Sequence, residues 1–107
     1  MTNITIYKQD DIFTGFKVSG HTGYEDAGKD IVCAGISALT INFINSVKEF
    51  MDDRFVVNTN EEDGMIDFKF EEKPSKESQV LLDSLVFGLE NLAKDYKEFI
   101  SLEFREV

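Results

Sequence analysis

The spacing of the apolar residues changes along this chain, and these changes constrain its fold more than any other feature. On both sides of the polar stretch KQDD, residues that favour the buried side of a strand recur at every second position. They are Ile4, Ile6, Ile12, Thr14, Phe16 and Val18. This alternation predicts two half-buried strands joined by a short turn. From Asp30 onward the spacing becomes three or four residues, which predicts a helix with Asp30 as its N-cap. The predicted apolar stripe comprises Val32, Ile36, Leu39, Phe43, Val47 and Phe50.

The second half of the chain repeats this change of spacing. The segments RFVVNTN and MIDFKF flank the turn EEDG, whose DG pair favours chain reversal and predicts a second hairpin. Pro74 and Ser75 then precede a second helical pattern. Its apolar positions are Leu81, Leu85, Leu89, Leu92 and Tyr96. A closing strand is predicted by the alternation of Ile100, Leu102 and Phe104.

The predicted order of elements is therefore ββαββαβ, and it favours one fold class. Two amphipathic helices separated by hairpins are buried most easily on one face of the same sheet. Successive hairpins make most neighbouring strands antiparallel. A chain of 107 residues, of which 42% are hydrophobic, encloses one hydrophobic core. We expect an α+β fold, a two-layer sandwich with both helices on one face of a mostly antiparallel sheet, and a single domain spanning residues 1–107.

The charge balance narrows the choice of partner. Eleven basic and 21 acidic residues give a net charge of −10, which disfavours nucleic acid and anionic membrane surfaces and favours a cationic protein or peptide. No segment is expected to provide the roughly 20 apolar residues that cross a bilayer, and the first residues do not resemble a secretion signal. We therefore expect a cytoplasmic protein, in which the only cysteine, Cys33, keeps a reduced thiol.

The segment GHTGYEDAGKDIVCAGIS contains the only histidine, His21, and the only cysteine, Cys33. The expected helix places Cys33 in its first turn, where unpaired N–H groups and aligned peptide dipoles favour the thiolate. A nearby imidazole can pair with a thiolate and protonate a leaving amine, as in cysteine hydrolases. His21 and Cys33 are therefore the candidate catalytic pair, and Gly20, Gly23 and Gly28 give the intervening loop conformational freedom.

Other interpretations of these residues stay open. Cysteines are often inert core residues, and Asp30 needs no role beyond capping the helix, although it is also placed to orient the histidine. Ser37 lies one turn after Cys33 and either lines a pocket or hydrogen-bonds a carbonyl, of which the second is favoured. Gly35 hints at the close approach of another backbone, such as a bound peptide.

Metal and nucleotide sites are disfavoured. Glu25, Asp26 and Asp30 lie near the sole histidine and cysteine but lack the paired spacing of a zinc site. The glycines do not have the spacing of a phosphate-binding loop, and no lysine-serine or lysine-threonine pair opens the helix. The sequence predicts neither a metal nor a cofactor.

The run GHTGYEDAGKDIVCAGISAL, together with the order ββαββαβ, resembles the bacterial family of ribosomal-processing cysteine proteases, Prp. The resemblance implies a homodimer that removes a short N-terminal extension from large-subunit ribosomal protein twenty-seven. It also implies that Cys33 is the nucleophile, that His21 is the general base and acid, and that Asp30 matches an aspartate of the family motif. Thr22 and Gly35 stand where alanine is usual in the family.

Two other functions fit parts of the sequence. A non-catalytic, acidic ribosome-assembly binding module would hold basic proteins through its surface charge and use Cys33 only for packing. A redox-sensing thiol would oxidise reversibly without cleaving a peptide. The reactivity of Cys33 and the fate of a substrate peptide distinguish both functions from proteolysis.

Overall fold

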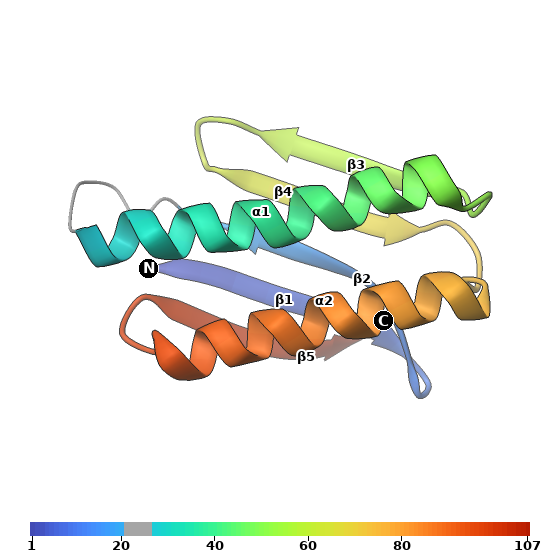
Figure 1. The fold of residues 1–107 in the computed structure, drawn as a ribbon. Coiled ribbons are helices and arrows are strands. Elements are labelled where there is room, and N and C mark those ends of the chain that lie inside the picture. The colour runs from blue at the N-terminus through green and yellow to red at the C-terminus, as the bar shows by residue number, and fades with distance from the viewer. Residues whose placement is uncertain (21–26) are drawn as a thin grey trace.

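The structure, a computed structural model, describes the backbone of residues 1–20 and 27–107 and the side chains of residues 1–20 and 31–107. Its elements follow the predicted order ββαββαβ (Figure 1). They are β1 (Thr2–Gln9), β2 (Ile12–Ser19), α1 (Ala27–Phe50), β3 (Phe55–Asn60), β4 (Met65–Phe70), α2 (Lys76–Asp95) and β5 (Ile100–Glu106). Both hairpins, both helices and the closing strand are therefore confirmed.

The strands form one sheet in the order β3-β4-β2-β1-β5. Neighbouring strands are antiparallel except β1 and β5, which are parallel. Ile6 of β1 pairs with Phe16 of β2 on one side and with Phe104 of β5 on the other. The mostly antiparallel sheet is confirmed, and its parallel pair arises because α2 carries the chain back along the sheet before β5 begins.

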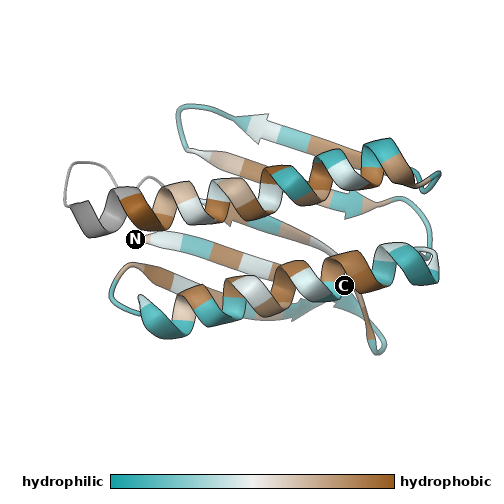
Figure 2. Cartoon of the chain, in the orientation of Figure 1, coloured by the Kyte–Doolittle hydropathy of each residue, from teal (hydrophilic) through white to brown (hydrophobic). Residues whose placement is uncertain are grey.

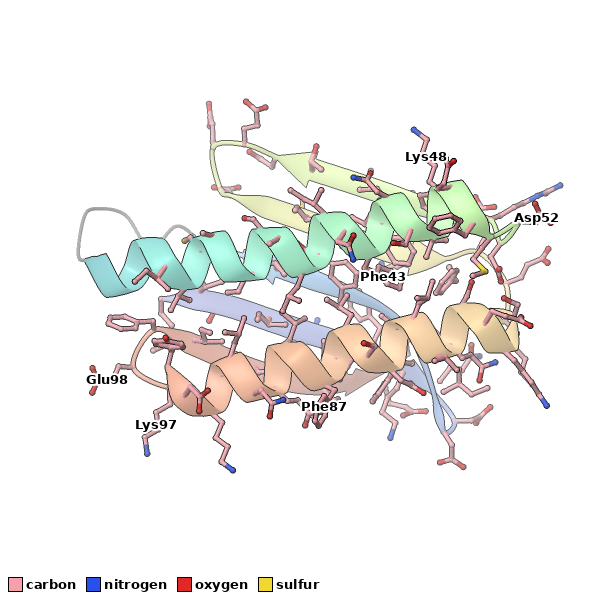
Figure 3. The ribbon with its side chains drawn as sticks, in the orientation of Figure 1. Phe43, Lys48, Asp52, Phe87, Lys97 and Glu98 are labelled. Atoms are coloured by element: carbon pink, nitrogen blue, oxygen red, sulfur yellow. The ribbon has the colours of Figure 1, made fainter. Side chains whose placement is uncertain are left out.

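Both helices lie on one face of the sheet, side by side (Figure 1). Phe43 points from α1 into the space between the helices and the sheet, whereas Phe87 points outward from α2 (Figure 3). The exposed fractions of these two side chains are 4% and 68%. Between the layers, the rings of Phe16, Phe43 and Phe68 contact one another with centroids 5.0–5.8 Å apart. The predicted two-layer α+β sandwich is confirmed.

The buried side of α1 differs from the predicted stripe at Leu39 and Phe50, which are 36% and 74% exposed. Leu39 turns toward α2, where its Cδ1 lies 3.2 Å from the place of a β-carbon on Gly88, and Phe50 is the last residue of the helix. Thr40 lies on the buried side instead, because its hydroxyl donates a hydrogen bond of 2.8 Å to the Ile36 carbonyl. The remaining members of the stripe are buried as predicted.

The expectation that no segment is long and apolar enough to cross a bilayer is wrong. Ile31–Phe50 has the length of a membrane span and a mean hydropathy of 1.4. One side of this segment packs against the sheet, where Val32 and Val47 are fully buried. That packing accounts for the apolar residues on the side that covers the sheet, because a helix that covers a sheet must be apolar on one side.

Ser75 starts α2 as predicted, since its hydroxyl accepts a hydrogen bond of 3.2 Å from the Ser78 N–H. Asp53, in the link between α1 and β3, accepts hydrogen bonds of 2.7–2.8 Å from the Ser75 N–H and from the hydroxyls of Ser75 and Ser78. Burial alone would raise the pKa of the Asp53 carboxyl, but these hydrogen bonds outweigh burial and hold its pKa below the ordinary value of 3.8. The carboxylate therefore ties the end of α1 to the start of α2.

Candidate active site

Cys33, the predicted nucleophile, lies on α1 with its side chain partly buried. Ser37 lies one turn further along the same helix and is exposed, so it does not form the floor of a pocket. His21 and Gly23 lie outside the described residues. The pairing of His21 with Cys33 therefore stays a prediction.

The start of α1 differs from the prediction. The helix begins at Ala27, three residues before Asp30, so Gly28 and Asp30 lie inside it and the assignment of Asp30 as N-cap is wrong. Alanine is the strongest helix former, and a helix tolerates one glycine and polar residues after it. None of these residues adds to an apolar stripe, which is why the apolar spacing did not reveal this turn.

Cys33 is consequently the seventh residue of α1 and not a residue of its first turn. Only the first four N–H groups of a helix lack a partner within it, and the electrostatic effect of a helix end fades within the first turn. The rise of a helix puts Cys33 about 9 Å along the axis from Ala27. The helix start therefore does not supply the positive potential that was expected at the sulfur.

The side of α1 from which Cys33 projects can be derived from the neighbours of Gly35. A β-carbon on Gly35 would lie 3.5 Å from Leu92 Cδ1, so this side of α1 faces α2. Residues two apart on a helix project about 200° apart, so Cys33 projects from the opposite flank, on the side of β3 and β4 (Figure 1). Within the described part of the chain, the close neighbour of Gly35 is a side chain of α2 and not another backbone, whereas the approach of a bound peptide stays a prediction.

The chain enters the segment that contains His21 from a fixed point, Gly20, directly after β2. Gly20 has a φ of +95°, and a β-carbon there would lie 2.6 Å from the Met1 carbonyl oxygen. The Gly20 N–H donates a hydrogen bond of 2.9 Å to the Asp63 carbonyl, in the turn between β3 and β4. Glycine is required here, because a larger residue would be strained and would collide with a neighbouring strand.

A hollow of about 430 Å³ adjoins this point. Its lining residues are Asn3, Lys17, Ser19, Gly20, Glu62, Asp63 and Met65. Both carboxyl-bearing residues belong to the segment EEDG, which the sequence indicates only as a turn. Its run of three acidic residues is the signal that would have drawn attention to a charged surface here.

These features meet at one end of the sandwich. The end of β2 and the start of α1, the two elements that precede and follow the segment containing His21 in the sequence, lie at the same end, and Cys33 belongs to the N-terminal part of α1 (Figure 1). A partly exposed thiol on a rigid helix flank is accessible to a substrate carbonyl. The arrangement suits a nucleophile presented to a peptide.

Comparison with known proteins identifies the family. The family model of cysteine protease Prp matches residues 1–101. The ribosomal processing cysteine protease Prp of Bacillus subtilis (strain 168) is 29% identical over 87 residues, which cover 78% of each chain. The crystal structure of the ribosomal processing protease Prp from S. aureus with a covalently linked product peptide has a TM-score of 0.86 at 25% identity, over 98% of this chain and 100% of that one. The crystal structure of SMU.848 from Streptococcus mutans has a TM-score of 0.89 at 25% identity, over 100% of this chain and 99% of that one. The match along nearly the whole chain, together with the shared fold, shows that this chain is a cysteine protease of the Prp family.

Proposed function

We propose that this chain, as a single domain spanning residues 1–107, is a cytoplasmic endopeptidase that removes the N-terminal extension of a basic large-subunit ribosomal protein, number twenty-seven by the family resemblance. The observation that carries the proposal is a partly exposed Cys33 on the flank of α1 in a chain of the Prp family. The ribosomal processing role of the Bacillus subtilis relative supports a ribosomal substrate. The net charge of −10 supports a cationic one, because opposite charges raise the encounter rate.

In the proposed reaction the Cys33 thiolate attacks the carbonyl carbon of the scissile bond, and His21 protonates the departing amine. The amine leaves as the new N-terminus of the ribosomal protein, and the extension stays bound to Cys33 Sγ as a thioester. His21 then takes a proton from water, whose oxygen attacks the thioester. The extension leaves as a carboxylic acid and the thiol is restored. The covalent product complex of the S. aureus protein supports a covalent step.

The position of Cys33 also affects where the oxyanion is stabilised. The N–H groups of α1 without helical partners are those of residues 27–30, which precede Cys33 by about one turn. We place the oxyanion on the side of Cys33 that faces the start of the helix, because these donors lie in that direction.

The proposal is tested by incubating the protein with the tailed ribosomal protein and identifying the new N-terminus by mass spectrometry. We expect one cleavage site for the parent protein. Cys33→Ala should abolish cleavage and keep the fold, because the side chains that bury α1 are unchanged. His21→Ala should be inactive at every pH, since both proton transfers are lost. Full cleavage by a stable variant of either kind would refute the assignment of that residue.

The non-catalytic binding module is distinguished by the reactivity of Cys33 toward an alkylating reagent at neutral pH. A catalytic Cys33 should react faster than cysteine in solution and should be protected by the substrate peptide. A packing thiol should react only after the protein has been unfolded in urea. The unfolded protein therefore serves as the control in the same experiment.

The outward face of α1 is the surface that we propose for the homodimer. Ile31 and Ile41 are 61% and 49% exposed, and the exposed Ala34 and Ala38 lie between them. Their spacing of three, four and three residues is that of a helix seam. No charged residue occurs between Ile31 and Val47, and in the coloured part of α1 strongly hydrophilic residues occur only in its C-terminal half (Figure 2). Two copies with a net charge of −10 repel each other least when they meet through an uncharged face.

A further inference from the structure

The turn between β3 and β4 is held by hydrogen bonds of its own. The side-chain oxygen of Asn60 accepts the N–H groups of Glu62 at 3.0 Å and Asp63 at 3.3 Å. Gly64 has a φ of +60°, and its N–H donates a hydrogen bond of 3.2 Å to the Glu61 carbonyl. Such a turn has one defined shape, and this shape sets the direction of the Asp63 carbonyl.

That carbonyl links this hairpin to the residue that directly follows β2. The pairing of β2 with β4 ends at Val18 and Ile66, and the hydrogen bond of 2.9 Å from Gly20 to Asp63 lies beyond it. On its other side Gly20 is so close to Met1 that a β-carbon would lie 2.6 Å from the Met1 carbonyl oxygen. Gly20, directly after β2, is therefore held between Met1 and the turn.

We propose that Asn60 is a positioning residue for the catalytic histidine: it holds the turn, the turn holds Gly20, and Gly20 sets the point from which the chain continues to His21. This inference rests on the proposed role of His21. Consecutive Cα atoms are about 3.8 Å apart, so a displacement of Gly20 is passed on to His21. A misplacement of about 1 Å between reacting groups can lower turnover about 100-fold. The turn thus acts on the rate without contacting the substrate.

Asn60→Ala tests the proposal, because it removes the oxygen that accepts both N–H groups at an exposed position of the sheet edge. We expect kcat for tail cleavage to fall about tenfold, with KM nearly unchanged. Asn60→Asp keeps an accepting oxygen and should restore most of kcat. Gly64→Ala disturbs the same turn through its positive φ and should lower kcat in the same way.

The pH dependence of Cys33 alkylation is a second readout, which a purely structural turn would not change. An imidazole held beside a thiolate makes the sulfur reactive at lower pH. Asn60→Ala should therefore shift the alkylation profile to higher pH, and Asn60→Asp should restore the profile of the parent protein.

Glu106→Ala is the matched control. Glu106 Oε1 accepts the Asp10 N–H at 2.9 Å in the turn between β1 and β2, at the opposite end of β2 from Gly20. Its loss should leave kcat and the alkylation profile unchanged. The proposal would be overturned if Asn60→Ala kept the kcat and the alkylation profile of the parent protein. It would also be overturned if Glu106→Ala lost as much kcat as Asn60→Ala. Failure of the proposed function shows differently, as full cleavage by His21→Ala.

Discussion

Gly35 occupies a helical position at which alanine would fit. A β-carbon there would lie 3.5 Å from Leu92 Cδ1, which is an ordinary van der Waals distance. Alanine is favoured over glycine in the interior of a helix by about 1 kcal/mol. We therefore expect Gly35→Ala to raise the free energy of unfolding by about 1 kcal/mol, as measured by urea denaturation.

Gly15→Ala is the contrasting variant in β2. A β-carbon at Gly15 would lie within 2.2 Å of the Phe68 carbonyl oxygen, and the backbone of a central strand cannot move aside. We expect the free energy of unfolding to fall by about 3 kcal/mol. A neutral Gly15→Ala, or a destabilising Gly35→Ala, would contradict this view of the two positions.

Residue types were sufficient to single out Cys33 but not to describe its surroundings. The apolar stripe correctly predicted a helix at Val32, whereas the turn from Ala27 to Asp30 adds no apolar residue to that stripe. The helix start was therefore placed too late, and with it the positive potential expected at the sulfur. A helix end depends on propensity and capping, which leave a weaker trace in the sequence than burial does.

At the level of elements, Asp53 connects α1 to α2 through hydrogen bonds from Ser75 and Ser78. A hydrogen bond to a charged group contributes about 1.5–3 kcal/mol. We expect Asp53→Ala to lower the free energy of unfolding by about 2 kcal/mol, because the serine groups lose their acceptor. Asp52→Ala is the control in the same urea experiment and should have little effect, since this neighbouring carboxylate is exposed at the surface (Figure 3).

The contribution of Asp53 depends on pH in a defined direction. Despite burial, its hydrogen bonds hold its pKa below the ordinary value of 3.8, so the folded state favours the carboxylate more than the unfolded chain does. The stabilisation is complete above the unfolded pKa and is lost as the pH falls through the folded pKa. The difference in stability between the parent and Asp53→Ala should therefore be largest near neutral pH and shrink in acid. A difference that grows in acid would contradict this assignment.

The sequence is least informative about which elements contact one another. The alternation from Ile100 to Phe104 predicted a strand but carries no sign of its partner, and the structure pairs it in parallel with β1. Leu39 fits the stripe of α1 by its spacing, yet it faces the second helix and not the sheet. Periodicity shows that a residue is apolar on one side of an element, whereas its neighbour depends on how the elements assemble.

At the scale of the whole molecule, net charge and exposed apolar surface favour the same face for self-association. Ala38→Glu adds a carboxylate to the centre of the uncharged face of α1 and should convert the proposed dimer into a monomer, as measured by sedimentation velocity. Ser84→Glu adds the same charge at an exposed position of α2 and should leave the dimer intact.

A dimer that survives Ala38→Glu would contradict this surface. The exposed Phe87 of α2 offers the clearest contrast, since its side chain points outward (Figure 3). If Phe87→Glu dissociates the dimer and Ala38→Glu does not, the contact lies on the outer side of α2.

The parallel pair of β1 and β5 also has a consequence for how the enzyme is made. The hydrogen bond of 2.8 Å from the Thr2 N–H to the Phe99 carbonyl and the register that follows it join strands from the two ends of the sequence. During synthesis β1 can pair with β2 early, but its second edge stays open until the last strand has been translated. An open edge is a template for pairing with other chains. The nascent enzyme is therefore more prone to aggregate while β5 has not yet been translated.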